Sequence, residues 1–312
     1  MMQVISTGIV GPFADMLSAP MFFAEVILGG LMAGVMYSMV ALGFVLIFKA
    51  SGVFNFAQGV MVLFAALTFV GQMERGVPIW VALLTTAGVM IALAFAIERV
   101  MLRPLVNQDP FTLLMATIGL TFFLEGVGEL LWGSNVKKLD VGIPEHSFTV
   151  AGILLNQFEL FAAATAALLV TVLAVLSQKT TIGRALRAVA DDHQAATAVG
   201  IPLQTIWVTV WSVAGLVALV AGIMWGVKSG VQFSLSLIAL KALPVLILGG
   251  LTSIPGAIIG GLIIGVGEKI AEVYWGPVIG GAIENWFAYV LAMVFLLFRP
   301  QGLFGEEIIE RV

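Results

Sequence analysis

Long apolar runs separated by short polar breaks follow one another along most of the chain. A helix needs about 20 apolar residues to cross the hydrocarbon core of a bilayer, and we place spans at the runs near or above that length. They are 26–48, 54–73, 79–98, 111–132, 159–177, 203–227, 236–251, 256–274 and 282–298. Because backbone in lipid must satisfy its own hydrogen bonds, the pattern predicts an all-α polytopic membrane protein with eight to nine transmembrane helices.

The runs 54–73 and 236–274 differ from the others, because Gly and Pro interrupt them. The interrupting residues are Gly59, Pro244, Gly249, Gly250, Pro255, Gly256, Gly260 and Gly261. We expect broken or re-entrant helices there, which membrane proteins tolerate only where protein or a cavity shelters the backbone. One such segment in each half of a transporter is typical of inverted-repeat folds, so the pattern also suits an inverted repeat.

Polar segments divide the chain without separating it into independent domains. We expect a single transmembrane domain over 1–312, with a first half at 25–177 and a second half at 203–305. Between them lies 178–202, the longest internal loop. A turn-rich loop at 133–158 lies on the opposite side.

The composition excludes several classes of protein. Hydrophobic residues make up 61% of the 312 and charged residues only 10%, against about 25% charged residues in soluble domains. Such a chain lacks the polar surface of a soluble enzyme or a disordered protein, and a net charge of −4 gives no basic field for nucleic acid. Cysteine is absent, and the two histidines are His146 and His193. We therefore expect no catalytic residues, no metal site and no cofactor.

The positions of Lys and Arg indicate the orientation, since cytoplasmic loops carry an excess of them. With the C-terminal tail inside, the inner side holds eight basic residues: Lys49, Arg99, Arg103, Lys179, Arg184, Arg187, Arg299 and Arg311. The outer side holds five: Arg75, Lys137, Lys138, Lys228 and Lys269. The first basic residue is Lys49, so the charged region of a signal peptide is missing. We expect the N-terminus outside and the C-terminus in the cytoplasm.

The internal loop contains a predicted helix. Thr180 or Thr181 can cap its start, and Gly200 followed by Pro202 ends it. Apolar residues recur at helical spacing: Ile182, Leu186, Val189, His193 and Ala196. The charged residues on the other faces are Arg184, Arg187, Asp191 and Asp192. Such a helix suits either docking of a soluble partner, with its apolar ridge in a groove, or an amphipathic helix at the lipid surface.

The chain shows no means of binding ATP itself. A phosphate-binding loop of the type Gly-x-x-x-x-Gly-Lys-Ser/Thr is absent, as is the dipeptide Gly-Lys. If ATP drives transport, the energy must come from another polypeptide through a cytoplasmic contact. Gln194-Ala195-Ala196, followed by three residues and Gly200, resembles the first half of the Glu-Ala-Ala-x-x-x-Gly loop of ABC importer permeases, with Gln in place of Glu. The second half of that motif is not matched.

Further motifs narrow the resemblance. They are Gly52-Val53-Phe54-Asn55-Phe56-Ala57-Gln58-Gly59, Ala116-Thr117-Ile118-Gly119, Gly183-Arg184-Ala185-Leu186-Arg187-Ala188, Leu248-Gly249-Gly250-Leu251-Thr252-Ser253-Ile254-Pro255-Gly256-Ala257 and Arg299-Pro300-Gln301-Gly302-Leu303-Phe304-Gly305. Together, from about residue 25 to 305, they resemble the permeases of branched-chain (hydrophobic) amino acid uptake systems of the LivH-like type. Two residues depart from that pattern: Val60, where an acidic residue usually follows the first motif, and Thr252, where glycine is usual.

The resemblance implies a permease subunit of a bacterial ABC importer in the plasma (inner) membrane, which forms the translocation pathway and is not an enzyme. Its implied partners are a second permease subunit, identical or distinct, two cytoplasmic ATP-binding subunits and an external (periplasmic) solute-binding protein. Coupling to the ATPases is assigned to Arg184, Arg187, Asp191, Asp192, Gln194 and Gly200. Because of the two departures, the solute stays open among branched-chain amino acids, other amino acids, urea or short amides, and small organic acids.

Polar residues within the interrupted runs are candidates to line the pathway. Asn55 and Gln58 begin the first such run. Thr252 and Ser253 lie between Gly-Gly and Pro-Gly in the second. Polar groups at such interruptions meet the substrate in inverted-repeat transporters, whereas the glycines also serve close helix packing. With Thr117 from the second motif, we expect these residues to form the translocation path.

Ionisable groups inside spans are functional candidates by default. Glu125 and Glu129 lie one helical turn apart near the outer end of their span. Glu268 and Glu272 repeat that spacing. A carboxylate at a helix end reaches the headgroups cheaply, which favours a structural interpretation of both pairs. Lys241, inside an apolar run, is expected to snorkel outward or to pair with a carboxylate such as Glu125.

An ion- or proton-coupled secondary carrier is the alternative function, with Glu125, Glu129 and Lys241 as coupling groups. A self-sufficient carrier has no need of a capped internal helix with the Gln-Ala-Ala-x-x-x-Gly sequence, so the sequence favours the ABC permease. Transport by this chain alone, driven by a proton gradient without ATP, would select the carrier.

Overall fold

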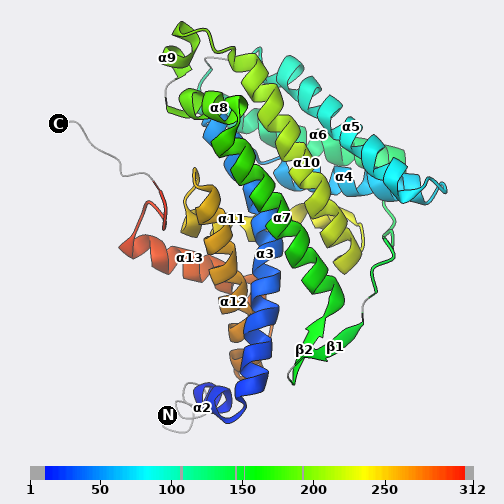
Figure 1. Cartoon of the computed structure of the whole chain (residues 1–312), viewed down its shortest axis with the longest axis vertical. Helices are drawn as coiled ribbons and strands as arrows, with labels where there is room; N and C mark the ends of the chain where they lie inside the picture. The colour runs from blue at the N-terminus through cyan, green and yellow to red at the C-terminus, as the bar shows by residue number, and fades with distance from the viewer. Residues whose placement is uncertain (1–10, 106–107, 145, 151, 192, 306–312) are drawn as a thin grey trace.

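The computed structural model describes residues 11–105, 108–144, 146–150, 152–191 and 193–305, which form a helical bundle (Figure 1). Its helices are α2 (Gly11–Ser18), α3 (Pro20–Ser51), α4 (Gln58–Met73), α5 (Ile79–Ile97), η2 (Glu98–Leu102), α6 (Pro110–Trp132), α7 (Gln157–Lys179), α8 (Thr181–Asp191), α9 (His193–Ala198), α10 (Leu203–Ser229), η3 (Phe233–Leu237), α11 (Ile238–Gly249), α12 (Ile254–Ile279), η4 (Ile283–Asn285) and α13 (Phe287–Phe298). A short antiparallel hairpin, β1 (Ser147–Val150) and β2 (Ile153–Asn156), precedes α7, with Ser147 opposite Asn156.

Six helices in the described part of the chain are long and apolar enough to cross a membrane: α3, α5 with η2, α6, α7, α10 and α12. Three shorter apolar helices account for the other predicted runs, namely α4, the η3–α11 segment and α13. The prediction of an all-α polytopic membrane protein is therefore confirmed. The predicted eight to nine spans include these shorter helices, and Figure 1 shows α13 crosswise to α3 and α12.

Gly and Pro break fewer helices than their distribution suggested. The expectation of a broken helix within 236–274 is confirmed at 250–253, where the chain leaves the helical conformation between α11 and α12, whereas α12 itself is continuous over 26 residues. Pro255 falls in its first turn, where a proline removes no helical hydrogen bond. α11 likewise continues through Pro244. The breaks that the structure does contain include the loops 52–57 and 250–253.

The contact between α3 and α12 forms the centre of the bundle, and glycines permit its close approach. A Cβ atom on Gly34 would stand 2.3 Å from the carbonyl oxygen of Gly261, and one on Gly265 would stand 2.4 Å from the Gly34 backbone. Small residues allow such backbone contact between membrane helices. Ser38 adds a second link, since its Oγ lies 2.9 Å from the Gly34 carbonyl and 3.1 Å from that of Ala257.

α4 is enclosed by longer helices. α10 packs against α3, α4 and α5, and every residue of α4 from Gln58 to Gly71 is buried. A helix that is apolar on all sides belongs inside a bundle. This explains why a helix of only 16 residues is stable there although it is shorter than a full span.

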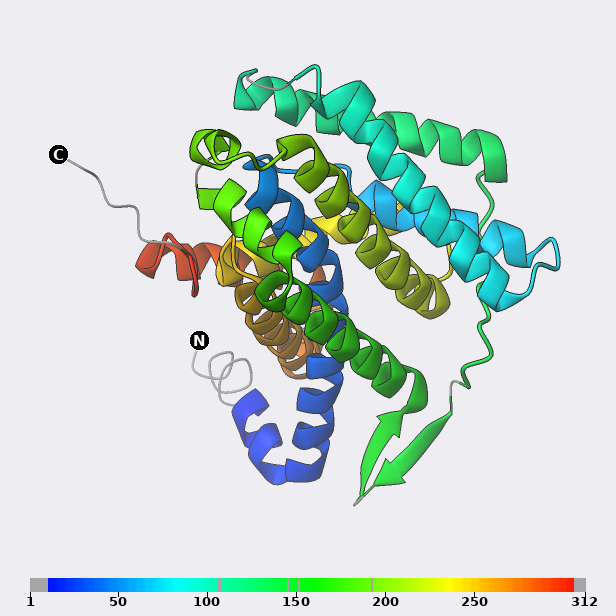
Figure 2. The ribbon, with the colours of Figure 1, turned by 45° about the horizontal axis from the view of Figure 1, so that its top comes forward.

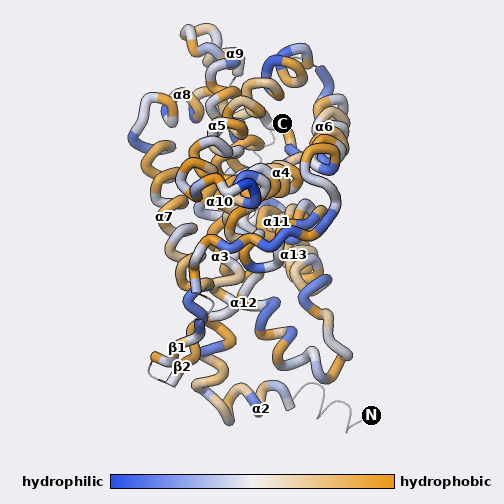
Figure 3. The backbone as a smooth tube through the Cα atoms, turned by 90° about the vertical axis from the view of Figure 1, so that its right-hand side faces the viewer, coloured by the Kyte–Doolittle hydropathy of each residue, from blue (hydrophilic) through white to orange (hydrophobic). Residues whose placement is uncertain are grey.

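Hydrophobic residues dominate the middle of the bundle and polar residues gather at loops and helix ends (Figure 3). α8 and α9 lie at one end of the long axis, and α2 and the β1–β2 hairpin lie at the other (Figures 1 and 2). Ion pairs join segments assigned to the outer side by sequence, Lys228 with Glu159 at 3.6 Å and Lys137 with Glu74. The predicted grouping of these segments agrees with the fold, while the assignment of the C-terminus to the cytoplasm stays a prediction.

Candidate functional site

The loop between α3 and α4 turns the chain back into the bundle. Gly52 ends α3 in the left-handed conformation (φ 66°), with its N–H bonded to the Phe48 carbonyl at 2.8 Å. The chain then returns alongside α3, because the ring of Phe54 stacks on Phe44, two turns before the end of that helix, with centroids 5.1 Å apart. α4 therefore begins beside α3, inside the bundle, and not beyond the end of α3.

Asn55 and Thr117 hold this loop in place. The Asn55 side-chain oxygen accepts the Ala57 N–H at 3.1 Å. From α6, the Thr117 hydroxyl accepts the Phe56 N–H at 3.3 Å, and its own proton is within reach of the carbonyl oxygens of Leu114 (2.9 Å) and Phe54 (3.3 Å). Side chains thus supply hydrogen bonds to backbone that is not helical, as burial inside a membrane protein demands.

Gln58, the first residue of α4, packs against Gly43 of α3, where the lack of a side chain lets α4 come close to α3. A Cβ on Gly43 would stand 2.0 Å from Gln58 Nε2. Gln58 is fully buried, and its amide nitrogen and oxygen have no hydrogen-bond partner among the described residues. The structure therefore brings Asn55, Gln58 and Thr117 together as buried residues around the loop, and their role in the translocation path stays a prediction.

The segment that meets the start of α4 is the beginning of η3–α11. A Cβ on Gly59 would stand 2.2 Å from the carbonyl oxygen of Ser236, so the two interrupted regions touch through backbone. Thr252 and Ser253 lie apart from this contact and line a separate cavity. That both segments line the translocation path stays a prediction.

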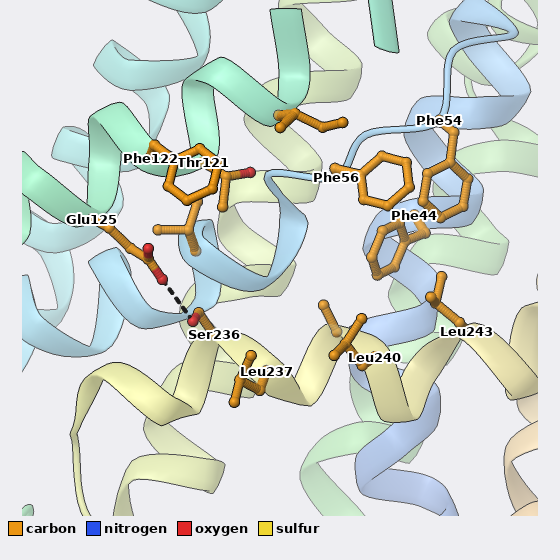
Figure 4. A pocket seen from close by; sticks show the side chains of 13 residues that line it. Phe44, Phe54, Phe56, Thr121, Phe122, Glu125, Ser236, Leu237, Leu240 and Leu243 are labelled. Carbon is orange, nitrogen blue, oxygen red and sulfur yellow. Dashed lines mark hydrogen bonds between the residues drawn. The ribbon is translucent and has the colours of Figure 1, made fainter. Parts of the chain in front are cut away.

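A groove of about 270 Å³ opens between α3, the 52–57 loop, α6 and α11; we call it the α6–α11 groove (Figure 4). Apolar side chains form most of its wall, among them Phe44, Phe54, Phe56, Phe122, Leu240 and Leu243. Phe122, at 69% exposed, and Leu237, at 58%, form a rim open to the surface of the bundle. The polar groups in the wall are Thr121, Glu125 and Ser236.

Glu125 and Glu129 separate into two environments. The Ser236 Oγ lies 2.9 Å from Glu125 Oε1 and 2.8 Å from the Phe233 carbonyl, so its single proton is available to either acceptor. Glu129, one turn further along α6, is exposed and outside the groove wall. Glu125 alone therefore presents a carboxylate to the groove.

Lys241 pairs with a carboxylate, as one of its two predicted alternatives stated, but the partner is Glu268 and not Glu125. Its Nζ lies 3.3 Å from Glu268 Oε1, which also accepts the Tyr37 hydroxyl at 2.9 Å. The Glu268 side chain is only 7% exposed. The expectation that this carboxylate reaches the headgroups from a helix end is wrong, because continuous α12 carries it past Tyr37 into the core. The ring of Tyr37 stacks on Trp225 at 5.7 Å.

Thr252 and Ser253 lie beside the internal loop. Ser253 caps α12, its hydroxyl accepting the Gly256 N–H at 3.0 Å. With Lys49 and Arg187, both residues line a second cavity of about 330 Å³. The segment after α13 closes on the same region, because Leu303 N–H bonds to the Leu248 carbonyl at 2.8 Å.

α8 starts and α9 ends as the sequence predicted. Thr180 caps α8 by accepting the Gly183 N–H at 3.0 Å, and Gly200 follows α9 with φ at 89°. Leu186 and Val189 are buried, and α8 contacts α3, α7 and α10. The middle of the predicted ridge is therefore covered by the chain's own helices and does not fill a partner's groove or face lipid, whereas Ile182 at its start is 50% exposed.

The surface that remains accessible on α8 and α9 is a different one. Arg184 is exposed and Arg187 is half-buried. Val199, directly after α9, is 76% exposed. Asp192 lies outside the described residues, as do the side chains of Asp191 and Gln194.

Sequence reasoning missed the groove wall. Only the polar residues of the 52–59 motif were predicted to line a path, and Phe54 and Phe56 were not. Their alternation with Asn55 could have indicated the groove wall, since alternate residues of an extended segment point to opposite sides. Ser236 and Phe44 carried no comparable signal. No group of three or more acidic or histidine side chains that could hold a metal ion occurs within the described residues.

Comparisons place the chain among known proteins. A family model described as "Branched-chain amino acid transport system / permease component" matches residues 26–299. The high-affinity branched-chain amino acid transport system permease protein BraD of Pseudomonas aeruginosa is 28% identical over 305 residues, covering 93% of this chain and 98% of that protein. The corresponding permease protein LivH of Escherichia coli K12 is 30% identical over 319 residues, covering 94% and 98%.

Among solved structures, PsaBC from Streptococcus pneumoniae in complex with Fab aligns with a TM-score of 0.47 at 12% identity. The alignment covers 93% of this chain and 95% of that one.

Replacing Lys241 with methionine is expected to destabilise the protein, because it leaves the Glu268 carboxylate buried without its cation. Breaking a buried pair costs about 3–5 kcal/mol, and since the Lys241 side chain is 28% exposed we expect about 2 kcal/mol. The measurement is the midpoint of thermal unfolding in detergent, followed by tryptophan fluorescence.

Lys241→Met/Glu268→Gln should recover most of that loss, since it removes both charges. Lys269→Met is the matched control on an exposed lysine and should leave the midpoint unchanged. Equal midpoints for Lys241→Met and the unaltered protein would contradict a stabilising pair.

Proposed function

Because the chain belongs to the branched-chain amino acid transport system permease family, we propose that it is the membrane-spanning permease subunit of an ABC importer for branched-chain or other hydrophobic amino acids. The match over residues 26–299 carries the proposal, since it covers five of the six long helices of the described chain completely and α3 from Val26 onward. The relatives are named as high-affinity permeases for branched-chain amino acids. An aliphatic solute also suits a chain whose one groove between α6 and α11 is lined mostly by phenylalanine and leucine.

In this proposal the chain works within a larger assembly. A second permease, a copy or a relative, completes the pathway, two ATP-binding subunits dock on the α8–α9 side, and a solute-binding protein delivers the amino acid on the opposite side. The chain sits in a bacterial inner membrane with its N-terminus outside. The excess of basic residues on the α8–α9 side supports this orientation.

α8 and α9 transmit the motion of the ATP-binding subunits. Arg184 and the segment around Val199 present the accessible surface, while the buried Leu186 and Val189 fix α8 to the bundle. A partner that moves α8 therefore moves the helices packed on it. This division into an accessible face and an anchored face supports a coupling role for Arg184, Arg187 and Gly200.

The translocation path runs past the interrupted regions. Asn55 and Thr117 support the loop whose phenylalanines face the α6–α11 groove, and Gln58 is buried directly after that loop, at the start of α4. Thr252 and Ser253 line the cavity next to Arg187, towards the side on which the solute leaves. The pathway thus joins the two cavities through movement of α3 and α11 rather than through a fixed channel.

Uptake by the reconstituted assembly tests the function. Proteoliposomes would contain this chain with its proposed second permease and ATP-binding subunits, and the proposed solute-binding protein would be added outside. We expect radiolabelled leucine to accumulate only with ATP on the ATPase side. Leucine uptake by this chain alone, driven by a proton gradient without ATP, would instead identify the secondary carrier.

The coupling role of α8 is tested by reversing one exposed charge. Arg184→Glu is expected to lower ATP-dependent uptake at least tenfold and to weaken co-purification of the ATP-binding subunits, because the change alters their docking surface without disturbing the core. Lys138→Glu makes the same charge reversal on an exposed lysine of the 133–144 loop and should leave both readouts unchanged. Normal uptake by Arg184→Glu would remove Arg184 from the coupling surface.

A further inference from the structure

The wall of the α6–α11 groove carries one negative charge and no positive one. Glu125 is the single ionisable side chain among the residues that line it. Thr121 and Ser236 supply hydroxyl groups, and the rest of the wall is apolar. This asymmetry favours a ligand that combines a cation with an apolar body.

Glu125 has no cation of its own in the described part of the chain. The ion pairs there join Lys137 to Glu74, Lys228 to Glu159 and Lys241 to Glu268. The partner of Glu125 is the neutral hydroxyl of Ser236, which shares its proton with the Phe233 carbonyl. A carboxylate inside a span is costly unless it is paired, so this residue is poised to accept a cation from outside the chain.

The groove has the dimensions and the surface for an aliphatic side chain. Its volume of about 270 Å³ is just below the range of about 300–1,000 Å³ for drug-sized ligands, as befits a smaller molecule. Phe44 and Phe54 are stacked and Phe56 lies edge-on to Phe54, with centroids 4.8 Å apart, so the aromatic wall is rigid. Leucines of α11 form the facing wall. An aliphatic chain buried there gains the usual hydrophobic stabilisation.

The start of α4 adds a place for an anion at the same groove. α4 begins without a side-chain cap, and Val60 in its first turn lines the groove. The positive end of the helix dipole favours a carboxylate there. A zwitterion would then lie between Glu125 and α4 with its side chain against the phenylalanines.

We propose that the α6–α11 groove is a transit site for a zwitterionic aliphatic amino acid, in which Glu125 binds the α-ammonium group. The proposal rests on the proposed function and assigns its substrate a place in this chain. It also explains why the groove opens at its rim, where Phe122 and Leu237 are exposed: the solute enters and leaves there as the second permease covers or uncovers the rim.

Transport by the complete assembly tests the role of the Glu125 charge. Glu125→Gln keeps the size and the hydrogen bond to Ser236 but removes the charge, and we expect leucine uptake at saturating solute-binding protein to fall at least tenfold. ATP hydrolysis stimulated by the loaded binding protein should stay within twofold, which a folding or docking defect would not allow. Glu129→Gln, the same change one turn along α6, should leave both rates unchanged.

The outcomes separate this proposal from the proposed function. If the unaltered assembly shows no ATP-dependent leucine uptake, the proposed function fails. If it does take up leucine and Glu125→Gln takes it up equally well, the transit site alone is overturned. Parallel loss of uptake and ATP hydrolysis would also overturn it, since Glu125 would then act on structure or coupling.

Photolabelling locates the solute directly. A diazirine analogue of leucine, loaded on the binding protein and irradiated during turnover, is expected to label the segments 54–60 and 237–243, with at least tenfold less label in Glu125→Gln. Labelling confined to other segments, or equal labelling of the variant, overturns the proposal. A diazirine phospholipid that labels these segments during turnover, when the leucine analogue does not, would identify the groove as a lipid contact and overturn it as well.

Discussion

The need to satisfy every backbone hydrogen bond within the bundle is the constraint on which this structure depends. Between α3 and α4 the chain leaves the helical conformation and returns into the protein, where the N–H groups of Phe56 and Ala57 are bonded by Thr117 and Asn55. Without those two side chains the loop would expose unpaired groups to an apolar interior, at a cost of several kcal/mol. With them, α4 starts inside the bundle and the phenylalanines of the loop form a wall of the groove.

The end of α3 connects the parts of the molecule that the proposed mechanism uses. Phe44 lies in the wall of the α6–α11 groove. Leu46 lines a cavity with Leu186 of α8, and Lys49 lines the cavity that contains Thr252 and Arg187. Less than two turns of one helix therefore touch the groove, the internal helix and the second cavity. α3 is also packed backbone-to-backbone on α12 through glycines, so in the proposed mechanism a displacement of α8 moves α3 and α12 together.

The sequence predicted those features that depend on local chemistry. Apolar runs located the helices, and Thr180 and Gly200 delimited the internal segment, because capping and left-handed turns need specific residue types. The contacts between the interrupted runs could not be predicted. Gly59 contacts Ser236, 177 positions away along the chain (236 − 59), and no local pattern encodes that contact. The same holds for Lys241 and Glu268, whose pairing requires α11 and α12 to be neighbours. Glu125 was identified as an intramembrane charge, but its groove was not, since Phe44, Phe54 and Leu240 are ordinary apolar residues until the fold brings them together.

The most direct test of the account is whether ATP at the partner subunits moves α8 relative to the rim of the groove. The chain has no cysteine, so Ile182→Cys on α8 and Phe122→Cys on α6, both at exposed side chains, give this subunit two defined sites for spin labels, attached before assembly with its partners. Electron–electron double resonance on the full assembly in lipid would record the distance between the labels with and without ATP. The account predicts a shift of several ångströms between the two states. An unchanged distance distribution, in an assembly that hydrolyses ATP and imports leucine, would contradict it.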